Sequence, residues 1–293
     1  MSEIHLLDIF VNAVLAIIML GLGLTLTRKD FGKILIYPKA IMVGLSTQIF
    51  VIPLIAFIIA VVSGISPEQK VGLVLVSTCA SGASSNLITH LVRGNVALAI
   101  SMTTLNSFIT LITLPFIVSM AMLFFLGSES KISLPVFETI LQIFIVTIVP
   151  ASIGVYIRHI FTDFAIGLEK PLKFILPVFL CLVFSFKIFG TESQGGSGIT
   201  FSEGIHIFPF VLMLNAGAMT AGYYIAKMMK LNFYNQFTIA IEVGLHNTAL
   251  ALLVAGTIIK SPEMEKPALI YALITFFTAF LFIYVIKGKK IFK

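Results

Sequence analysis

Residues 233–256 read FYNQFTIAIEVGLHNTALALLVAG, an apolar stretch whose middle is interrupted by Glu242 and by the polar run from His246 to Thr248. The stretch is long enough to cross a hydrocarbon core of about 30 Å as a helix. An ionisable side chain inside such a span faces a bundle interior or a wet cavity, because its exposure to lipid is costly. The stretch therefore predicts one helix of a membrane-embedded bundle, with chemistry at its centre.

A second stretch, residues 71–92, has the same character. Its interruption, from Ser77 to Asn86, reads STCASGASSN and combines hydroxyl, amide and glycine residues. The two stretches are the third and the eighth of nine apolar stretches along the chain. Polar, glycine-containing interruptions at corresponding places in two halves of a membrane protein are the best sequence indication of a transporter's binding site.

Apolar residues fill the whole chain. Of its 293 residues, 58% are hydrophobic and 11% are charged, and the mean hydropathy is +1.08, whereas a soluble domain usually has about 25% charged residues. The sequence therefore predicts an all-α polytopic membrane protein and excludes a soluble domain. Its nine predicted transmembrane helices cover residues 6–27, 38–62, 71–92, 95–126, 135–157, 171–190, 205–229, 233–256 and 267–286.

The nine spans divide into two related halves. The first four spans, residues 6–126, can be laid over the last four, residues 171–286, in opposite orientation, and residues 135–157 form the linking span. We expect inverted structural repeats within one transmembrane transporter domain, residues 1–293, with the interrupted helices at corresponding positions.

Basic residues predict the orientation of the spans. Fourteen of them lie at alternate junctions, on one side of the membrane, and the other side has far fewer. Because cytoplasmic loops are enriched in Lys and Arg, we expect the N-terminus outside and the C-terminus in the cytoplasm of a cell (inner) membrane. The fourteen residues are Arg28, Lys29, Lys33, Lys39, Arg93, Arg158, Lys170, Lys173, Lys227, Lys230, Lys287, Lys289, Lys290 and Lys293.

Glu242 is the sharpest candidate for function. No basic residue occupies the middle of any other span, so a carboxylate buried there must recruit a proton or a metal ion; the structural alternative is a protonated Glu that fixes helix packing. Hard cations prefer oxygen ligands, and Gly82 and Gly244 would help the backbone to expose carbonyl oxygens. Side-chain oxygens at the interruptions and on neighbouring spans come from Ser84, Ser85, Asn86, Thr103, Gln48 and Asn247.

His246 follows Glu242 by one helical turn, so both side chains are expected to face one cavity. Histidine is the side chain that changes charge most readily near neutral pH. Two interpretations stay open from the sequence: His246 makes transport sensitive to pH, or it is an interior histidine that donates one hydrogen bond.

The sequence lacks the residues that several other kinds of functional site require. The two cysteines, Cys79 and Cys181, are too few for a disulfide framework and have no metal-ligand spacing. The sequence contains no Gly-Lys-Ser/Thr phosphate-binding run and no His-Glu-x-x-His zinc motif. We therefore expect neither an ATP-driven pump nor an enzyme, and the basic residues flank the spans rather than form a nucleic-acid-binding surface.

At these residues the sequence resembles the bile acid:sodium symporter (BASS) family, over essentially the whole chain. The motifs that carry the resemblance are Gly21 to Leu26 with Asp30-Phe31, Ser84-Ser85-Asn86 followed by Arg93 to Leu98, and Glu242 to Asn247. The resemblance implies a panel domain, a core domain and two broken helices that cross near the membrane midplane. It also implies alternating access driven by sodium, in a bacterial homologue with nine spans where its relatives commonly have ten.

The resemblance further assigns cation ligands. One sodium site would comprise Ser85, Asn86, Thr103 and Glu242, and the other would comprise Gln48, Glu242, Val243, Leu245 and His246. Two positions depart from the family pattern, since Ala99 stands where a serine is frequent and His246 stands where a glutamine is usual. Sodium is the expected coupling ion, and coupling to H+ through His246 and Glu242, or uncoupled transport, is the alternative.

The family's substrates imply an organic anion that is bile-acid-like, a steroid conjugate or a small keto or hydroxy acid. Its anionic group would face a helix N-terminus at the crossing, and its polar contacts would come from Asn247, Thr248, Ser84 and Thr275. The alternatives are a carrier of another small anion and a membrane sensor that binds an organic anion without moving it. Flux across a sealed bilayer separates the carrier from the sensor.

Overall fold

The computed structural model describes residues 13–14, 16–21, 23–24, 36–127, 136–190 and 196–288. Within these ranges the protein is built from helices, and the only extended pairing is an isolated antiparallel bridge between Ser81 and His246. The predicted all-helical class is thereby confirmed for this part of the chain. The first predicted span, residues 6–27, lies partly outside the described residues.

Five helical segments of the described chain are long and apolar enough to cross a membrane alone. They coincide with the predicted spans 38–62, 95–126, 135–157, 205–229 and 267–286, although the last helix begins earlier than predicted. Their elements are α3 (Pro38–Ser46), η2 (Thr47–Val51) and α4 (Ile52–Val62); α7 (Val96–Leu126); α8 (Val136–Ile143), η3 (Phe144–Ile148) and α9 (Val149–Ile160); α11 (Phe201–Met228); and α14 (Pro262–Lys287). A further long helix, α10 (Thr162–Phe189), covers the predicted span 171–190 and starts nine residues before it.

Both predicted interruptions are breaks in a helix. Residues 79–82 separate α5 (Pro67–Thr78) from α6 (Ala83–Leu91), and residues 245–247 separate α12 (Phe233–Gly244) from α13 (Thr248–Leu252), which continues as η5 (Leu253–Ile258). The Gly82 amide donates to the Leu245 carbonyl at 3.3 Å, and the Asn247 amide donates to the Ala80 carbonyl at 2.7 Å. The two breaks therefore meet, and each supplies backbone partners that the other lost on leaving helical geometry.

Side-chain caps mark where helices begin. Ser66 and Gln69 form a reciprocal capping box at the start of α5, and the side chain of Asn95 accepts from the third amide of α7. At the second break, the side chain of Asn247 accepts a hydrogen bond from the Leu250 amide at the start of α13. Such caps satisfy amides that have no partner in the first turn. Asn247 is therefore a structural residue of the crossing, in addition to any contact it makes with a ligand.

Two long segments contain a π-helical turn before a proline. η2 ends two residues before Pro53, and η3 ends two residues before Pro150. Proline has no N–H to donate, and its ring crowds the carbonyl four residues earlier. A wider turn relieves that crowding, and such turns are frequent at functional sites. The first of them contains Gln48, one of the predicted ligands.

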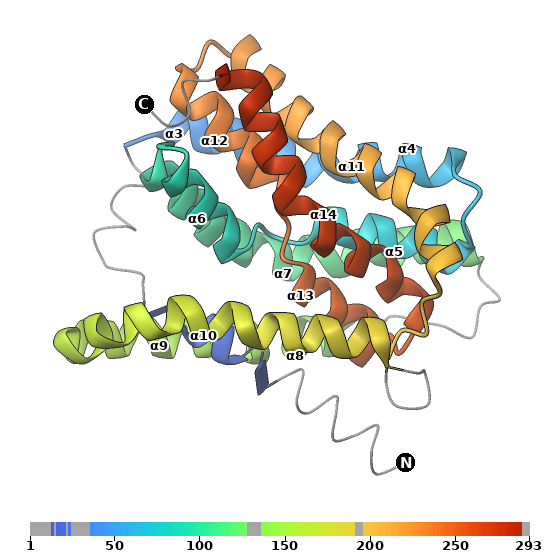
Figure 1. Ribbon diagram of the computed structural model, residues 1–293, viewed down its shortest axis with the longest axis horizontal. Helices are drawn as coiled ribbons and strands as arrows, with labels where there is room; N and C mark the ends of the chain where they lie inside the picture. Colours follow the sequence, from blue (N-terminus) through green and yellow to red (C-terminus); the bar gives the residue numbers. More distant parts are fainter. Residues whose placement is uncertain are drawn as a thin grey trace.

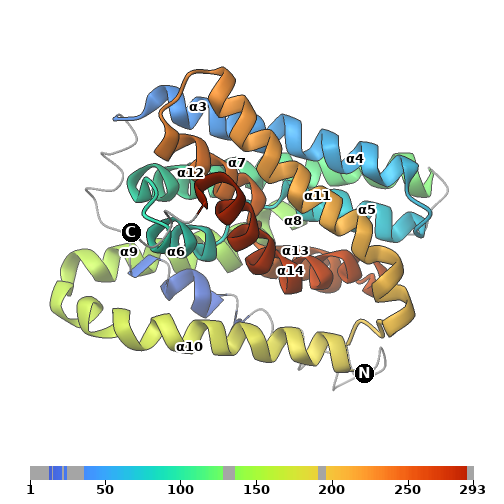
Figure 2. The same cartoon turned by 45° about the horizontal axis from the view of Figure 1, so that its top comes forward.

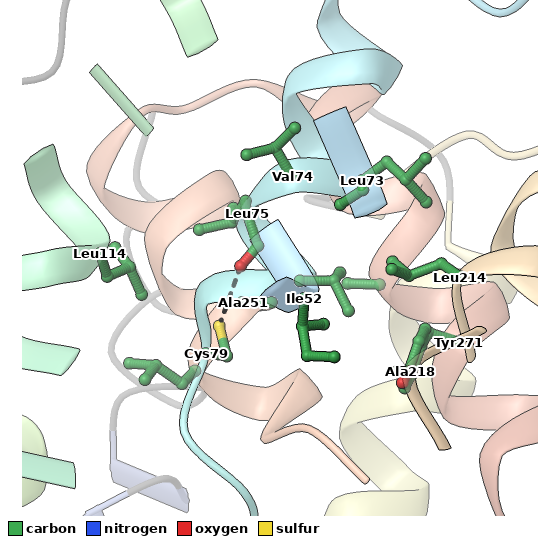
Figure 3. Packing of buried hydrophobic residues seen from close by; sticks show 14 of the residues in the cluster. Ile52, Leu73, Val74, Leu75, Cys79, Leu114, Leu214, Ala218, Ala251 and Tyr271 are labelled. Carbon is green, nitrogen blue, oxygen red and sulfur yellow. Dashed lines mark hydrogen bonds between the residues drawn. The ribbon is translucent and has the colours of Figure 1, made fainter. Parts of the chain in front are cut away.

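The helices pack in two layers around the crossing. α9 and α10 lie together along one side of the molecule, and α4, α5, α11, α12 and α14 lie on the other (Figures 1 and 2). Figure 3 shows the apolar core of the larger layer, in which Ile52 of α4, Leu75 of α5, Leu214 of α11 and Ala251 of α13 converge. These side chains are fully buried, so one half of each broken helix, α5 and α13, is anchored in this core.

Candidate functional site

Glu242 lies in the last turn of α12, next to the crossing, and only 1% of its surface is exposed. Its Oε2 atom accepts hydrogen bonds from the hydroxyls of Ser81 at 2.6 Å and Thr103 at 2.8 Å. Its Oε1 atom is also buried and has no hydrogen-bond partner in the described part of the protein. A buried carboxylate is stable only when it is paired and hydrogen-bonded, so the Oε1 atom is available to bind a further partner.

Ser81 is a contact of Glu242 that the sequence analysis did not single out. It lies on the bridge of the first break, opposite His246, and its Oγ atom lies 3.2 Å from that of Thr103. Ser81, Thr103 and Glu242 come from the first break, from α7 and from α12, and all three are buried. The cluster therefore joins three elements that are distant in the sequence.

The structure brings together most of the first predicted ligand set. The Thr103 hydroxyl lies near two acceptors. The nearer one is the carboxylate of Glu242, and the other is the Asn86 Oδ1 atom at 3.5 Å. Ser85 is fully buried, and its hydroxyl donates to the Gly82 carbonyl at 2.8 Å, within the first turn of α6. Because a hydroxyl that donates to one acceptor keeps its lone pairs, Ser85 retains the capacity to bind a cation.

Gln48 connects the π-helical turn to the first break. Its Nε2 atom donates to the carbonyls of Cys79 at 3.2 Å and Ser77 at 3.5 Å. Since both neighbours are acceptors, the amide nitrogen must face them, and the amide oxygen points elsewhere. The side chain thus supports the end of α5 with its nitrogen and offers its oxygen as a ligand.

His246 shares one face of the bridge with Ser81. The backbone hydrogen bonds of the bridge are made by the residues on either side of Ser81 and His246, and not by these two residues. In an antiparallel pair of this kind, the Cα atoms are about 4.5 Å apart and the two side chains are adjacent. The Nδ1 atom of His246 lies 2.8 Å from the Tyr271 hydroxyl of α14. Its Nε2 atom is buried and has no hydrogen-bond partner among the described residues.

Backbone groups of the second break complete this region. The carbonyl of Gly244 accepts from Tyr271 at 2.6 Å and from the Asn215 side chain of α11 at 2.8 Å. Val243 and Leu245, the two predicted backbone ligands, flank Gly244 and are fully buried. The Leu245 carbonyl accepts from Gly82 at 3.3 Å, so the crossing already uses one lone pair of that predicted ligand. Tyr271 and Asn215 were not among the predicted site residues.

A cavity of about 200 Å³ opens beside the crossing. Asn86, Thr103 and Asn247 form one wall, and side chains of η3 and α9, including Thr147 and Ser152, form the opposite wall. Ligand sites of this kind are mostly apolar with a few placed polar groups, and here hydroxyls and amides alternate with residues such as Phe108. The cavity thus adjoins the carboxylate cluster, and Thr103 belongs to both.

The four predicted substrate contacts are spread over different places. Asn247 lines the cavity, whereas Thr248 is buried in the first turn of α13 and Ser84 is half-buried in the first turn of α6. Thr275 contacts the Gly244 carbonyl at 3.4 Å and the Asn215 amide at 3.3 Å, in the network behind the crossing. The structure therefore places Asn247 and Thr275 in separate environments.

The donor set at the crossing suits a hard cation. Carboxylate, hydroxyl, amide and backbone oxygens are the ligands that such ions prefer. No group of three or more His, Cys, Asp or Glu side chains that could hold a metal ion occurs in the described ranges.

A separate charged cluster lies where α10, α11 and α14 approach α5. Lys187 of α10 and Glu265 of α14 form an ion pair of 2.8 Å, and both are nearly fully buried. Lys266 pairs with Glu203 of α11 at 3.1 Å and with Glu263, which accepts from the Gln69 side chain of α5 at 2.8 Å. This cluster joins α10 to the larger layer of helices, and its place was not predicted from the sequence.

Comparison with known proteins identifies relatives. Residues 12–194, more than half of the chain, match the Sodium Bile acid symporter family. The chain is 29% identical over 268 residues to the uncharacterized sodium-dependent transporter YocS of Bacillus subtilis, covering 90% of this chain and 78% of that protein.

Two further relatives come from a plant and an animal. The chain is 27% identical over 260 residues to the probable chloroplastic sodium/metabolite cotransporter BASS1 of Arabidopsis thaliana, covering 86% of this chain and 60% of that protein. It is 27% identical over 296 residues to the ileal sodium/bile acid cotransporter of Oryctolagus cuniculus, covering 97% of this chain and 81% of that protein.

Proposed function

Because this chain belongs to the sodium bile acid symporter family, we propose that it is a multi-pass secondary transporter that couples the entry of sodium to the movement of an organic anion. The observation that supports this proposal most directly is the carboxylate of Glu242. It is buried beside a helix crossing, accepts two hydroxyl hydrogen bonds on one oxygen and has no partner on the other among the residues that the structure describes. An anionic group in that state attracts a cation from water.

The ligand chemistry and the relatives favour sodium over the proton as the coupling ion. One sodium ion would be bound by oxygens of Glu242, Asn86, Thr103 and Ser85. A second ion would be bound by Glu242, Gln48, His246 and the carbonyls of Val243 and Leu245. The relatives from Bacillus, Arabidopsis and rabbit all have sodium in their names. We therefore assign Glu242 as the ligand that both sodium ions share.

The size of the cavity favours a small substrate. At about 200 Å³, it lies below the range of about 300–1,000 Å³ that is usual for drug-sized ligands. A keto or hydroxy acid therefore suits this cavity better than a bile acid does. Asn247 and the hydroxyls of Thr104 and Ser107 line the cavity and would bind the polar groups of the anion.

The topology that accompanies this proposal has nine spans and two inverted repeats, with α5–α6 and α12–α13 as the crossing helices. α9 and α10 would belong to the panel domain, and the larger layer of helices would form the core domain. The excess of basic residues at alternate junctions supports an N-terminus that would lie outside the membrane. Transport would proceed by alternating access to the cavity.

Two measurements test the proposal. Uptake of radiolabelled pyruvate and taurocholate into proteoliposomes is compared with an inward sodium or potassium gradient, for the wild-type protein and Glu242→Ala. We expect uptake of pyruvate that requires sodium and is lost in Glu242→Ala. Thermal unfolding in detergent, with sodium or potassium at matched ionic strength, reports binding independently of flux. Sodium-specific stabilisation without uptake of either probe would contradict this choice of substrate and leave a carrier of another small anion or a sensor, and equal stability in both ions would contradict the sodium site.

A further inference from the structure

Two buried acceptor atoms near the crossing have no hydrogen-bond partner in the described part of the chain: Glu242 Oε1 and His246 Nε2. Both residues are at least 97% buried, with 1% and 3% of their surfaces exposed. A buried polar atom without a partner is costly, and such atoms are rare in folded proteins. Two of them within five residues of chain call for a common explanation.

The protonation of His246 follows from its neighbour. The Tyr271 hydroxyl has one proton, and it lies 2.6 Å from the Gly244 carbonyl, which accepts and cannot donate. The same hydroxyl lies 2.8 Å from His246 Nδ1. Since the tyrosine proton is directed to the carbonyl, the histidine must donate the second bond, and its proton resides on Nδ1. Nε2 of the neutral ring is then unprotonated.

Tyr271 is held rigidly in the position that this hydrogen-bond chain requires. The side chain is fully buried in the core (Figure 3), and its ring packs edge-on against His246, with the ring centroids 5.3 Å apart. The Asn215 side chain donates to the same Gly244 carbonyl at 2.8 Å. The carbonyl is thereby fixed from α11 while the tyrosine is fixed on α14, and His246 has one orientation that satisfies Nδ1.

We propose that Tyr271 is a positioning residue that fixes the Nδ1–H tautomer of His246, so that unprotonated Nε2 serves as a ligand for the cation held by Glu242. The opposite tautomer would direct an N–H toward the cation and repel it. The bridge supports this geometry, because His246 and Ser81 share one face and Ser81 contacts Glu242. The cation would then satisfy both unpartnered atoms. This inference rests on the proposed sodium site.

The first test observes the tautomer without any cation. The protein is produced with ring-15N histidine, and the signal of His246 is assigned by its loss in His246→Gln. In potassium, we expect the wild-type ring to show a protonated Nδ1 and an unprotonated Nε2, and Tyr271→Phe to give a mixture of tautomers. A protonated Nε2 in the wild-type protein would overturn the inference, whatever the outcome of transport assays.

The second test measures sodium binding in a double-mutant cycle. The sodium concentration for half-maximal thermal stabilisation is determined for wild type, Tyr271→Phe, His246→Gln and the double variant. Tyr271→Phe removes one hydrogen bond, so we expect its half-maximal sodium concentration to rise about two- to tenfold. We expect no rise when the same change is made in the His246→Gln background. An equal rise in both backgrounds would overturn the inference, because it would mean that Tyr271 acts only on the fold.

Tyr223→Phe is the matched control, since Tyr223 is a buried tyrosine of α11 that packs through ring contacts with Tyr224 and Phe282. Its sodium midpoint should equal that of the wild type. Tyr271→Phe should fold, because Asn215 still donates to the Gly244 carbonyl. If the wild-type protein shows no sodium-dependent stabilisation, the proposed function fails, and the tautomer measurement alone then decides the role of Tyr271.

Discussion

The hydroxyl of Ser81 donates a 2.6 Å hydrogen bond to the carboxylate of Glu242, 161 residues further along the chain. Ser81 belongs to the first broken helix and Glu242 to the second. The two breaks therefore share one buried charge as well as their backbone hydrogen bonds. The charge of Glu242, the hydroxyls that donate to it and the neighbouring cavity can each be changed by a separate substitution.

Glu242→Gln should leave a folded protein that no longer binds sodium. The amide keeps the shape of the side chain and can still bond to Ser81 or Thr103, but it lacks the charge that attracts the ion. A ligand present at a hundredfold excess over its Kd stabilises the folded state by about 2.7 kcal/mol, and this sodium-specific gain should vanish. Glu138→Gln, at an exposed position of α8, is the control and should keep the gain. A sodium-specific gain in Glu242→Gln would contradict the assignment.

Ser81→Ala should weaken sodium binding and destabilise the protein, because Glu242 Oε2 then has one donor instead of two. Hydrogen bonds to charged groups contribute about 1.5–3 kcal/mol, so chemical unfolding in potassium should show a loss of that order. Ser107→Ala is the control, since its hydroxyl donates to the Thr103 carbonyl and does not contact the carboxylate. Equal effects of the two changes would argue that Ser81 has no special relation to Glu242.

Lys187→Met should destabilise the protein by about 3–5 kcal/mol, the usual cost of breaking a buried ion pair by removing one partner. The ammonium that neutralises Glu265 is lost, while the carboxylate stays buried between α10 and α14. The double variant Lys187→Met/Glu265→Met should recover much of the loss. Unfolding of the wild type, Lys187→Met, Glu265→Met and the double variant gives the coupling energy of the pair, and additive effects would show that the two charges do not interact.

Thr104→Phe should block transport while preserving sodium binding. Thr104 lines the cavity, and a phenyl ring there would take up much of a space of about 200 Å³. Thr104→Val removes a hydroxyl proposed to bind the anion but adds no volume, so its uptake should fall less than that of Thr104→Phe. Sodium-driven uptake should fall at least tenfold only in the phenylalanine variant, with unchanged sodium-dependent stabilisation in both. Normal uptake by Thr104→Phe would place the substrate path elsewhere.

His246→Gln should raise the apparent affinity for sodium, because an amide oxygen is a better ligand for a hard cation than an imidazole nitrogen is. Sodium titrations of thermal stability check this outcome. Identical titrations of the two proteins would show that the side chain at this position does not bind the ion.

The sequence predicted the breaks in the helices well because their physical cause is local. Serine, glycine and asparagine interrupt two apolar runs, and these residues lower the helix propensity there. Each break contains fewer residues than the interruption that predicted it, since α6 begins at Ala83 and α13 at Thr248. Local signals therefore locate a break within a few residues, and packing determines its ends.

The contacts of Glu242 were predicted only in part, because they depend on geometry at the break. The first interruption contains four serines, and the extended backbone at Ser81 directs that particular hydroxyl to the carboxylate. Helical spacing counted from Asn86 does not predict which of the four serines contacts Glu242. Tyr271 and Asn215 stand in apolar runs far from the interruptions, where tyrosine and asparagine have many other roles. Their part in orienting the second break is visible only once α11 and α14 are packed against it.

The hydrogen bonds between the breaks have a mechanical consequence. The amides of Gly82 and Asn247 each bind a carbonyl of the other broken helix, and the bond from Ser81 to Glu242 adds a third link. If one broken helix slid past the other, all three buried bonds would break together. In the transport cycle proposed above, the crossing would therefore move as one piece with its bound ions, and the surfaces that slip would lie at its borders with the surrounding helices.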